Sequence, residues 1–222
     1  IYLYLDGEEK DKKQVYRENF REVENSQNIF IGTKKDFVIK GAIIEPTING
    51  YIQDLRITKK VEYTQEDFKK NTDIIPSNCS SVLATCPELH IQSLSRDSVY
   101  DIKDRGYSLH NILSIGLPFN DSANELMNQT TIKFSKDNLL KVENQFNIIH
   151  QKLIDWTLMF WIKPSLNGEK NQCVCSNFLS SSGFELLYNT EEDKLLLNIY
   201  NNKKKILELK SEPSQDKILS NE

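Results

Sequence analysis

The sequence predicts an all-β protein built as an antiparallel β-sandwich. Apolar residues recur at every second position in several short segments, which is the period of a half-buried strand. Polar clusters separate these segments at similar intervals, as turns do. Helical spacing occurs in one short stretch, QFNIIHQKLI (residues 145–154), which is equally consistent with an irregular loop. Regularly spaced strands with polar turns favour a sandwich over alternating strands and helices.

The first strands are expected close to the start of the chain. In IYLYL (residues 1–5) isoleucine and leucine alternate with tyrosine, and the following Asp6-Gly7 is a hairpin-turn pair. In NIFIG (residues 28–32) two isoleucines flank a phenylalanine before a glycine, which indicates a second short strand.

The strand predicted at residues 51–57 carries charges inside an apolar pattern. Strict alternation places Tyr51, Gln53, Leu55 and Ile57 on one face, and Ile52, Asp54 and Arg56 on the other. An unpaired charge on a half-buried sheet face is costly, so Asp54 and Arg56 are predicted to form a structural pair rather than a ligand site. Gly50, just before this strand, is predicted to relieve a tight backbone.

The second half of the chain contains the longest apolar alternation and a predicted meander. The two predicted faces of the alternating strand are Trp156, Leu158, Phe160 and Ile162 against Thr157, Met159, Trp161 and Lys163. Phe160 is therefore expected in the core, and Trp161 on the opposite side. Three further strands are expected near residues 184–188, 195–199 and 207–209, separated by TEED and NNKK.

Charge and hydropathy exclude two classes of partner. The net charge is −4, and lysine and arginine are spread along the chain, so no nucleic-acid partner is predicted. The longest apolar run, near residues 154–162, is about half the length that crosses a bilayer, so no membrane insertion is predicted.

The cysteines and the acceptor asparagines favour an extracellular or surface-displayed protein, with a virion component as the alternative. Cys79 and Cys86 are the candidate disulfide, since they can close a small loop. Cys173 and Cys175 are too close along one strand to bridge easily, and no second ligand pair matches them as a metal site. The candidate glycosylation sites, all expected in loops, are Asn78, Asn120 and Asn128.

Several segments resemble one known family. GYIQDLRITKKVEYTQEDF (residues 50–68) resembles the closing strand of concanavalin A-like, laminin-G-like jelly-roll modules, and LYLDG and NIFIG resemble strands that come shortly before it. PELHIQSLSRDSVYDIKDRGYSLHNILSIG (residues 87–116) resembles the opening of such a module, and DWTLMFWIKP (residues 155–164) resembles its next strands.

The order of these resemblances implies two tandem modules, each incomplete, in a piece of a longer polypeptide. Residues 1–70 would be the C-terminal half of a first module, residues 71–87 a linker, and residues 88–222 the N-terminal and middle part of a second module. The alternative is a single permuted domain that is built from both pieces.

Catalysis is not predicted. The chain has no nucleophile elbow, no phosphate-binding glycine loop and no alternating carboxylate motif of the kind that glucanases of this fold class carry. The favoured function is a structural or adhesion module that contacts neighbouring modules or identical chains. The alternative is a glycan-binding lectin-type module. No cofactor is predicted except calcium in that alternative, for which the candidate ligands are Asp97, Asp101 and Asp104.

Overall fold

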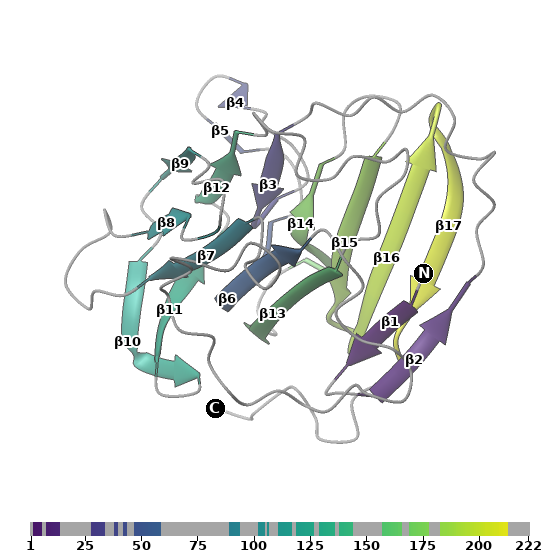
Figure 1. Ribbon diagram of the computed structural model, residues 1–222, viewed down its shortest axis with the longest axis horizontal. Helices are drawn as coiled ribbons and strands as arrows, with labels where there is room; N and C mark the ends of the chain where they lie inside the picture. The colour runs from purple at the N-terminus through teal and green to yellow at the C-terminus, as the bar shows by residue number, and fades with distance from the viewer. Residues whose placement is uncertain are drawn as a thin grey trace.

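The described part of the chain is all-β, and all of its paired strands run antiparallel (Figure 1). This computed structural model describes residues 2–5, 8–13, 28–33, 38–39, 42–43, 47–58, 89–93, 102–104, 106, 111–116, 119–126, 129–135, 138–143, 157–165, 169–177 and 183–212. No helix occurs among these residues. The predicted helical alternative at residues 145–154 and Trp156 lie outside them.

Two larger sheets contain most of the strands. The six-stranded sheet consists of β6 (Gly50–Thr58), β7 (Leu89–Ser93), β8 (Ile102–Asp104), β10 (Phe119–Leu126), β11 (Gln129–Phe134) and β13 (Thr157–Pro164). The seven-stranded sheet has the order β17 (Lys204–Lys210), β16 (Lys194–Asn201), β15 (Gly183–Asn189), β14 (Asn171–Ser176), β3 (Ile29–Ile31), β12 (Leu139–Val142) and β9 (Ile112–Ile115).

Two small hairpins accompany these sheets. β1 (Tyr2–Leu5) pairs with β2 (Glu8–Lys12), on either side of the predicted Asp6-Gly7 turn. The second hairpin joins β4 (Val38–Ile39) to β5 (Ala42–Ile43).

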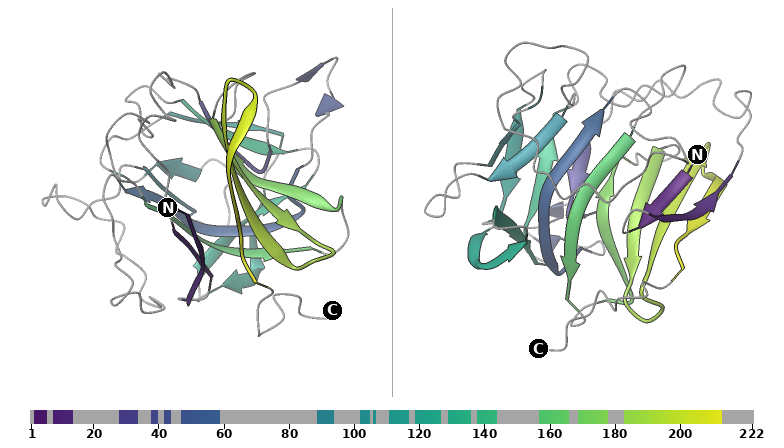
Figure 2. Two further views of the ribbon diagram at one scale, coloured as in Figure 1. Left: turned by 90° about the vertical axis from the view of Figure 1, so that its right-hand side faces the viewer. Right: turned by 60° about the horizontal axis from the view of Figure 1, so that its bottom comes forward.

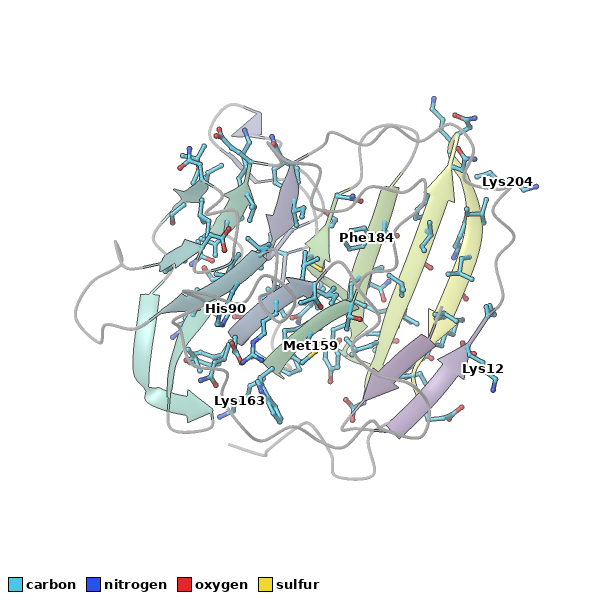
Figure 3. The ribbon with its side chains drawn as sticks, viewed as in Figure 1. Lys12, His90, Met159, Lys163, Phe184 and Lys204 are labelled. Atoms are coloured by element: carbon cyan, nitrogen blue, oxygen red, sulfur yellow. The ribbon has the colours of Figure 1, made fainter. Side chains whose placement is uncertain are left out.

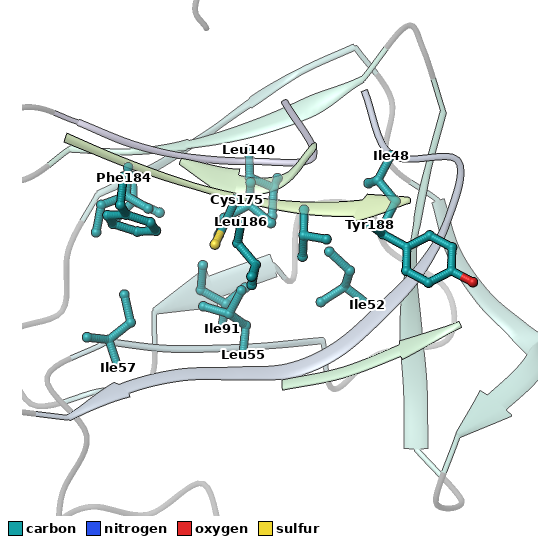
Figure 4. Packing of buried hydrophobic residues seen from close by; sticks show 14 of the residues in the cluster. Ile48, Ile52, Leu55, Ile57, Ile91, Leu140, Cys175, Phe184, Leu186 and Tyr188 are labelled. Atoms are coloured by element: carbon teal, nitrogen blue, oxygen red, sulfur yellow. The ribbon is translucent and has the colours of Figure 1, made fainter. Parts of the chain in front are cut away.

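Figure 2 shows the strands of the two larger sheets from two further sides. One hydrophobic cluster contains buried residues from both of these sheets. Ile52, Leu55 and Ile57 of β6 point toward Leu140 of β12 and Leu186 of β15 (Figure 4). Burial of one large aliphatic side chain stabilises a fold by about 1.5 to 3 kcal/mol, so a cluster with many such residues holds the two layers together.

The predicted C-terminal meander is confirmed. β15, β16 and β17 are consecutive neighbours in the seven-stranded sheet and lie side by side (Figure 1). The turns between them contain Asp193, Asn202 and Lys203, all with positive φ, as tight hairpin turns require. Their alternating apolar residues face the core, as period two predicts.

Strands that come before residues 71–87 pair with strands that come after them. β3 lies between β12 and β14, and β6 pairs with β7, β11 and β13. Strands from residues 28–58 therefore lie inside sheets whose other members come from residues 89–212. Local sequence resemblance indicates which strands exist, but not which distant strands complete their hydrogen bonds.

The alternation predicted for β13 is present. Leu158, Phe160 and Ile162 pack against the hydrophobic cluster, as the period-two pattern requires. These side chains are half-buried rather than fully buried. β13 pairs only with β6 among the described strands, which accounts for the smaller burial.

Phe160→Ala is expected to lower the free energy of unfolding by about 1.5 to 3 kcal/mol, because part of the ring is already exposed to water. Phe134→Ala is the matched comparison, since Phe134 of β11 is fully buried. That variant should lose about 3 to 5 kcal/mol. Urea unfolding of both variants measures the difference, and equal losses would show that the partial burial of Phe160 is incorrect.

Candidate functional site

β6 contains a β-bulge at Asp54. Gln53 pairs with Trp161 and Arg56 pairs with Met159, so two residues of β6, one of them Asp54, lie opposite a single residue of β13. The backbone of Asp54 has a φ of +55°, a left-handed conformation that aspartate tolerates better than most residues. An extra residue in this conformation bends a strand and redirects the side chains that follow it.

The bulge corrects the predicted faces of this strand. Ile52, Leu55 and Ile57 all face the hydrophobic cluster, whereas strict alternation placed Ile52 on the opposite face with Asp54 and Arg56. The additional residue shifts the phase of the alternation by one position, so the residues before and after the bulge cannot follow one continuous period of two. The prediction was wrong because it assumed an unbroken strand.

The carboxylate of Asp54 is held by two basic side chains. Nε of Arg56 donates to Oδ1 of Asp54 at 2.9 Å, and Nη2 of Arg56 donates to Oδ2. Nε2 of His90 lies 2.6 Å from the same Oδ1. All three residues are buried, so the low local dielectric strengthens these charge-assisted hydrogen bonds. The residues predicted to pair, Asp54 and Arg56, therefore do form an ion pair.

His90 is the member of this cluster that sequence reasoning missed. It lies on β7 directly across from Arg56, and the two residues are far apart in the sequence. Nδ1 of His90 has no hydrogen-bond partner in the described part of the chain. Because an ionised carboxylate only accepts hydrogen bonds, Nε2 is the ring nitrogen that donates to Asp54. Figure 3 shows His90 among the strands of the six-stranded sheet.

Asp104 fixes the backbone beside His90. Its Oδ1 accepts hydrogen bonds from the backbone N–H of His90 at 2.9 Å and of Gly106 at 2.7 Å. Asp104 was a candidate calcium ligand together with Asp97 and Asp101, which lie outside the described residues. Within the described ranges, no three histidine, cysteine or acidic residues are grouped as a metal site would need. Asp104 thus links the backbone of β7 to that of Gly106.

The buried polar cluster lies where the six-stranded sheet divides. Gly50 to Ile52 pair with β11, whereas Leu55 to Ile57 pair with β7, and β13 follows the opposite edge of β6 throughout. Asp54 occupies the junction between the two neighbours. Its contact with His90 ties β6 to β7 at that junction. This geometry supports a structural role, in which the buried polar cluster fixes the register between β6 and β7.

A second polar set connects β15 and β16. Oη of Tyr200 donates to Oε1 of Glu185 at 2.8 Å, and Nδ2 of Asn198 donates to the same oxygen at 3.1 Å. Glu185 and Asn198 are direct cross-strand neighbours. Burial, and after it the hydrogen bond to Glu185, raises the pKa of Tyr200 above its ordinary value. The phenol therefore stays a hydrogen-bond donor at neutral pH.

Glu208 on β17 lies between two lysines, Lys205 and Lys210. Hydrogen bonds from Lys205 and then from Lys210 lower the pKa of Glu208 to about 2, from an ordinary value of 4.5. A lowered pKa means that the native state holds the charged form more strongly than the unfolded chain does. Glu208 therefore contributes stability above about pH 4.5, and this contribution is lost as the pH falls through about 2.

Glu208→Gln is expected to lower the thermal midpoint at pH 7 by about one or two degrees, because a partly exposed ion pair contributes little to the free energy of unfolding. At pH 2 the variant and the wild-type protein should differ less, because Glu208 is then losing its charge. Thermal unfolding at both pH values measures this difference. Glu212→Gln is the control, since Glu212 is exposed and follows the same strand. An equal loss at both pH values would contradict the assignment.

Cys173 and Cys175 on β14 are buried thiols that take part in no disulfide. Burial raises the pKa of the Cys175 thiol to about 12, which keeps it in its less reactive protonated form. The candidate disulfide residues Cys79 and Cys86 lie outside the described residues, as do the candidate glycosylation sites Asn78 and Asn128.

The third candidate glycosylation site, Asn120, lies in strand β10 opposite Ile132, not in the predicted loop. The acceptor pattern of three residues does not by itself distinguish a loop from a strand.

In the described part of the chain, no helix has the length and apolar character needed to cross a bilayer. Comparisons with known proteins gave no match, whether to a protein family, to a curated protein or to a solved structure.

Proposed function

We propose that this chain is a non-catalytic structural or adhesion module of a larger surface or assembly protein. It contacts neighbouring modules or identical chains, in an extracellular, surface-displayed or virion setting. The fold underlying this role is a concanavalin A-like jelly roll, for which the two antiparallel sheets around one core and the motif resemblances at residues 50–68 and 155–164 are the support.

The observation that carries the proposal is the apolar character of the edge strands. Leu113 lies on β9, the last strand of the seven-stranded sheet. Its side chain is 40% exposed, and among the described residues it is the one large hydrophobic residue that is exposed. β13, with its half-buried apolar side chains, is paired on one edge by β6. An exposed apolar side chain on an edge strand favours contact with another protein.

The buried polar groups favour the same role. Asp54, Arg56 and His90 bind one another, and Asp104 binds backbone N–H groups. Side chains engaged in this way stabilise strand pairing and do not turn toward a substrate. We therefore assign the cluster to the fold of the module.

Self-association of the purified chain tests the proposal. Light scattering after size exclusion should give an average mass above 25.8 kDa that rises with protein concentration. Leu113→Lys should reduce this association. Ser114→Lys, a change at the adjacent exposed position of the same strand, should leave it closer to wild type.

Two results would overturn the proposal. One is a chain that stays monomeric at all concentrations up to about 100 μM and binds no other protein module. The other is a monomeric chain that binds a sugar on a glycan array and releases it in chelator, since this would favour the lectin alternative.

A further inference from the structure

The segment of residues 28–58, which we call the donor segment, supplies one interior strand to each of the two larger sheets. β3 lies between β12 and β14 in the seven-stranded sheet. β6 lies between β13 on one edge and β7 with β11 on the other. Apart from the donor segment, the strands of both larger sheets come from residues 89–212. We call residues 89–212 the acceptor.

The donor segment also completes the core. Six of the 23 buried residues of the hydrophobic cluster belong to it, so the acceptor strands by themselves would leave a gap in both layers of that cluster. The six are Ile29, Ile31, Ile48, Ile52, Leu55 and Ile57. Figure 4 labels Ile48, Ile52, Leu55 and Ile57 beside acceptor side chains such as Phe184 and Leu186.

Specific hydrogen bonds set the position of the donor segment in the acceptor. The backbone N–H of Gly32 donates to the carbonyl of Val174 at 2.8 Å, and that of Ser165 donates to the carbonyl of Asn49 at 2.7 Å. The buried contact of Asp54 with His90 crosses the same boundary. The donor segment is thus bound as a strand in a fixed register, by the backbone and by a buried charged group.

The covalent connection does not by itself determine which acceptor receives a given donor segment. Residues 59–88 join β6 to β7, and thirty residues can span at most about 100 Å. We propose that the donor segment of one chain can occupy the acceptor of a second copy, with the contacts it makes within one chain, and so link copies by strand exchange. This inference rests on the proposed assembly function and names its partner and its mode of binding.

Local concentration decides between exchange and self-insertion. A connection of this length gives an intramolecular effective concentration in about the millimolar range, so an isolated dilute chain fills its own acceptor. Copies held next to one another in an assembly reach similar concentrations, and exchange then competes with self-insertion. A test therefore has to remove self-insertion.

Complementation between two full-length variants removes it. A donor-defective chain carries Gly50→Val with Leu55→Asp, and an acceptor-defective chain carries Leu140→Asp with Leu186→Asp. Each variant buries charge in the core and is expected not to fold alone. The donor-defective chain keeps an intact acceptor, and the acceptor-defective chain keeps an intact donor segment. Refolding the two together at about 20 μM should then form one native unit within a dimer of twice 25.8 kDa.

The readouts are near-ultraviolet circular dichroism and mass by light scattering. The mixture should recover up to half of the wild-type signal, because each dimer holds one intact unit and one defective unit. The matched control mixes the donor-defective chain with a second donor-defective chain that carries Ile52→Asp and Ile57→Asp, so that no intact donor is present. This mixture should recover no signal.

Recovery of signal only in the complementary mixture supports strand exchange. No recovery in that mixture overturns it, as does equal recovery in the control mixture, which would reflect non-specific association. The result is independent of the test of the proposed function, since Leu113 plays no part in it. If the wild-type chain stays monomeric but complementation succeeds, the proposed edge contacts are rejected. The proposal of strand exchange then still stands.

Discussion

Asp54→Asn is expected to lower the free energy of unfolding by about 3 to 5 kcal/mol. Asparagine keeps the size of the side chain and tolerates the left-handed backbone, so the change removes mainly the negative charge. The guanidinium of Arg56 then stays buried without its counter-ion, and the amide nitrogen that replaces one carboxylate oxygen cannot accept its hydrogen bond. Urea unfolding at pH 7 measures the loss.

A double-mutant cycle identifies the source of this loss. Arg56→Met alone leaves the Asp54 carboxylate buried and should be similarly costly. The double variant should be less destabilised than the sum of the two single variants, because it contains no unpaired buried charge. Strict additivity would mean that the two side chains do not stabilise each other. A loss below about 1 kcal/mol for Asp54→Asn would show that the carboxylate is solvated.

Gly50→Ala is also expected to have a large effect, lowering the free energy of unfolding by about 3 to 4 kcal/mol. Gly50 has a φ of +150°, and a Cβ at this position would lie 2.4 Å from the carbonyl oxygen of Lys163 and 2.8 Å from Cα of Pro164. Both are backbone atoms of β13, so no side chain can move aside. The substitution should separate the start of β6 from the end of β13.

Gly116→Ala is the matched control for this prediction. Gly116 also has a positive φ, of 75°, but it is exposed at the end of an edge strand. Gly116→Ala should lower the free energy of unfolding by only about 1 kcal/mol, because backbone strain is its only cost. Thermal or urea unfolding of both variants gives the comparison. If the two losses agree, the close approach of β13 to Gly50 has no energetic consequence.

The strands themselves were largely predictable from the sequence. The alternation in β3, β13, β15, β16 and β17 predicted strands there, because a two-residue period has a direct physical cause in the pleat. Adjacent strands joined by short polar turns pair with each other, so the C-terminal meander also followed from local information.

The buried polar cluster was predictable only in part. Asp54 and Arg56 are two residues apart on a strand, and the cost of burying an unpaired charge predicts that they interact. His90 reaches them through the pairing of β6 with β7, a contact between distant parts of the chain. The bulge at Asp54 left no clear pattern either, since an aspartate in a strand does not reveal a left-handed backbone.

The sequence by itself determined the strands, the C-terminal hairpins and the need for Asp54 to find a charged partner, because each depends on residues that are close along the chain. Only the tertiary structure decided which strands share a sheet, and so placed residues 28–58 inside sheets made by residues 89–212. It also decided that Ile52 faces the core and that His90 joins Asp54. These outcomes depend on long-range pairing, in which one bulge changes the face of every residue beyond it.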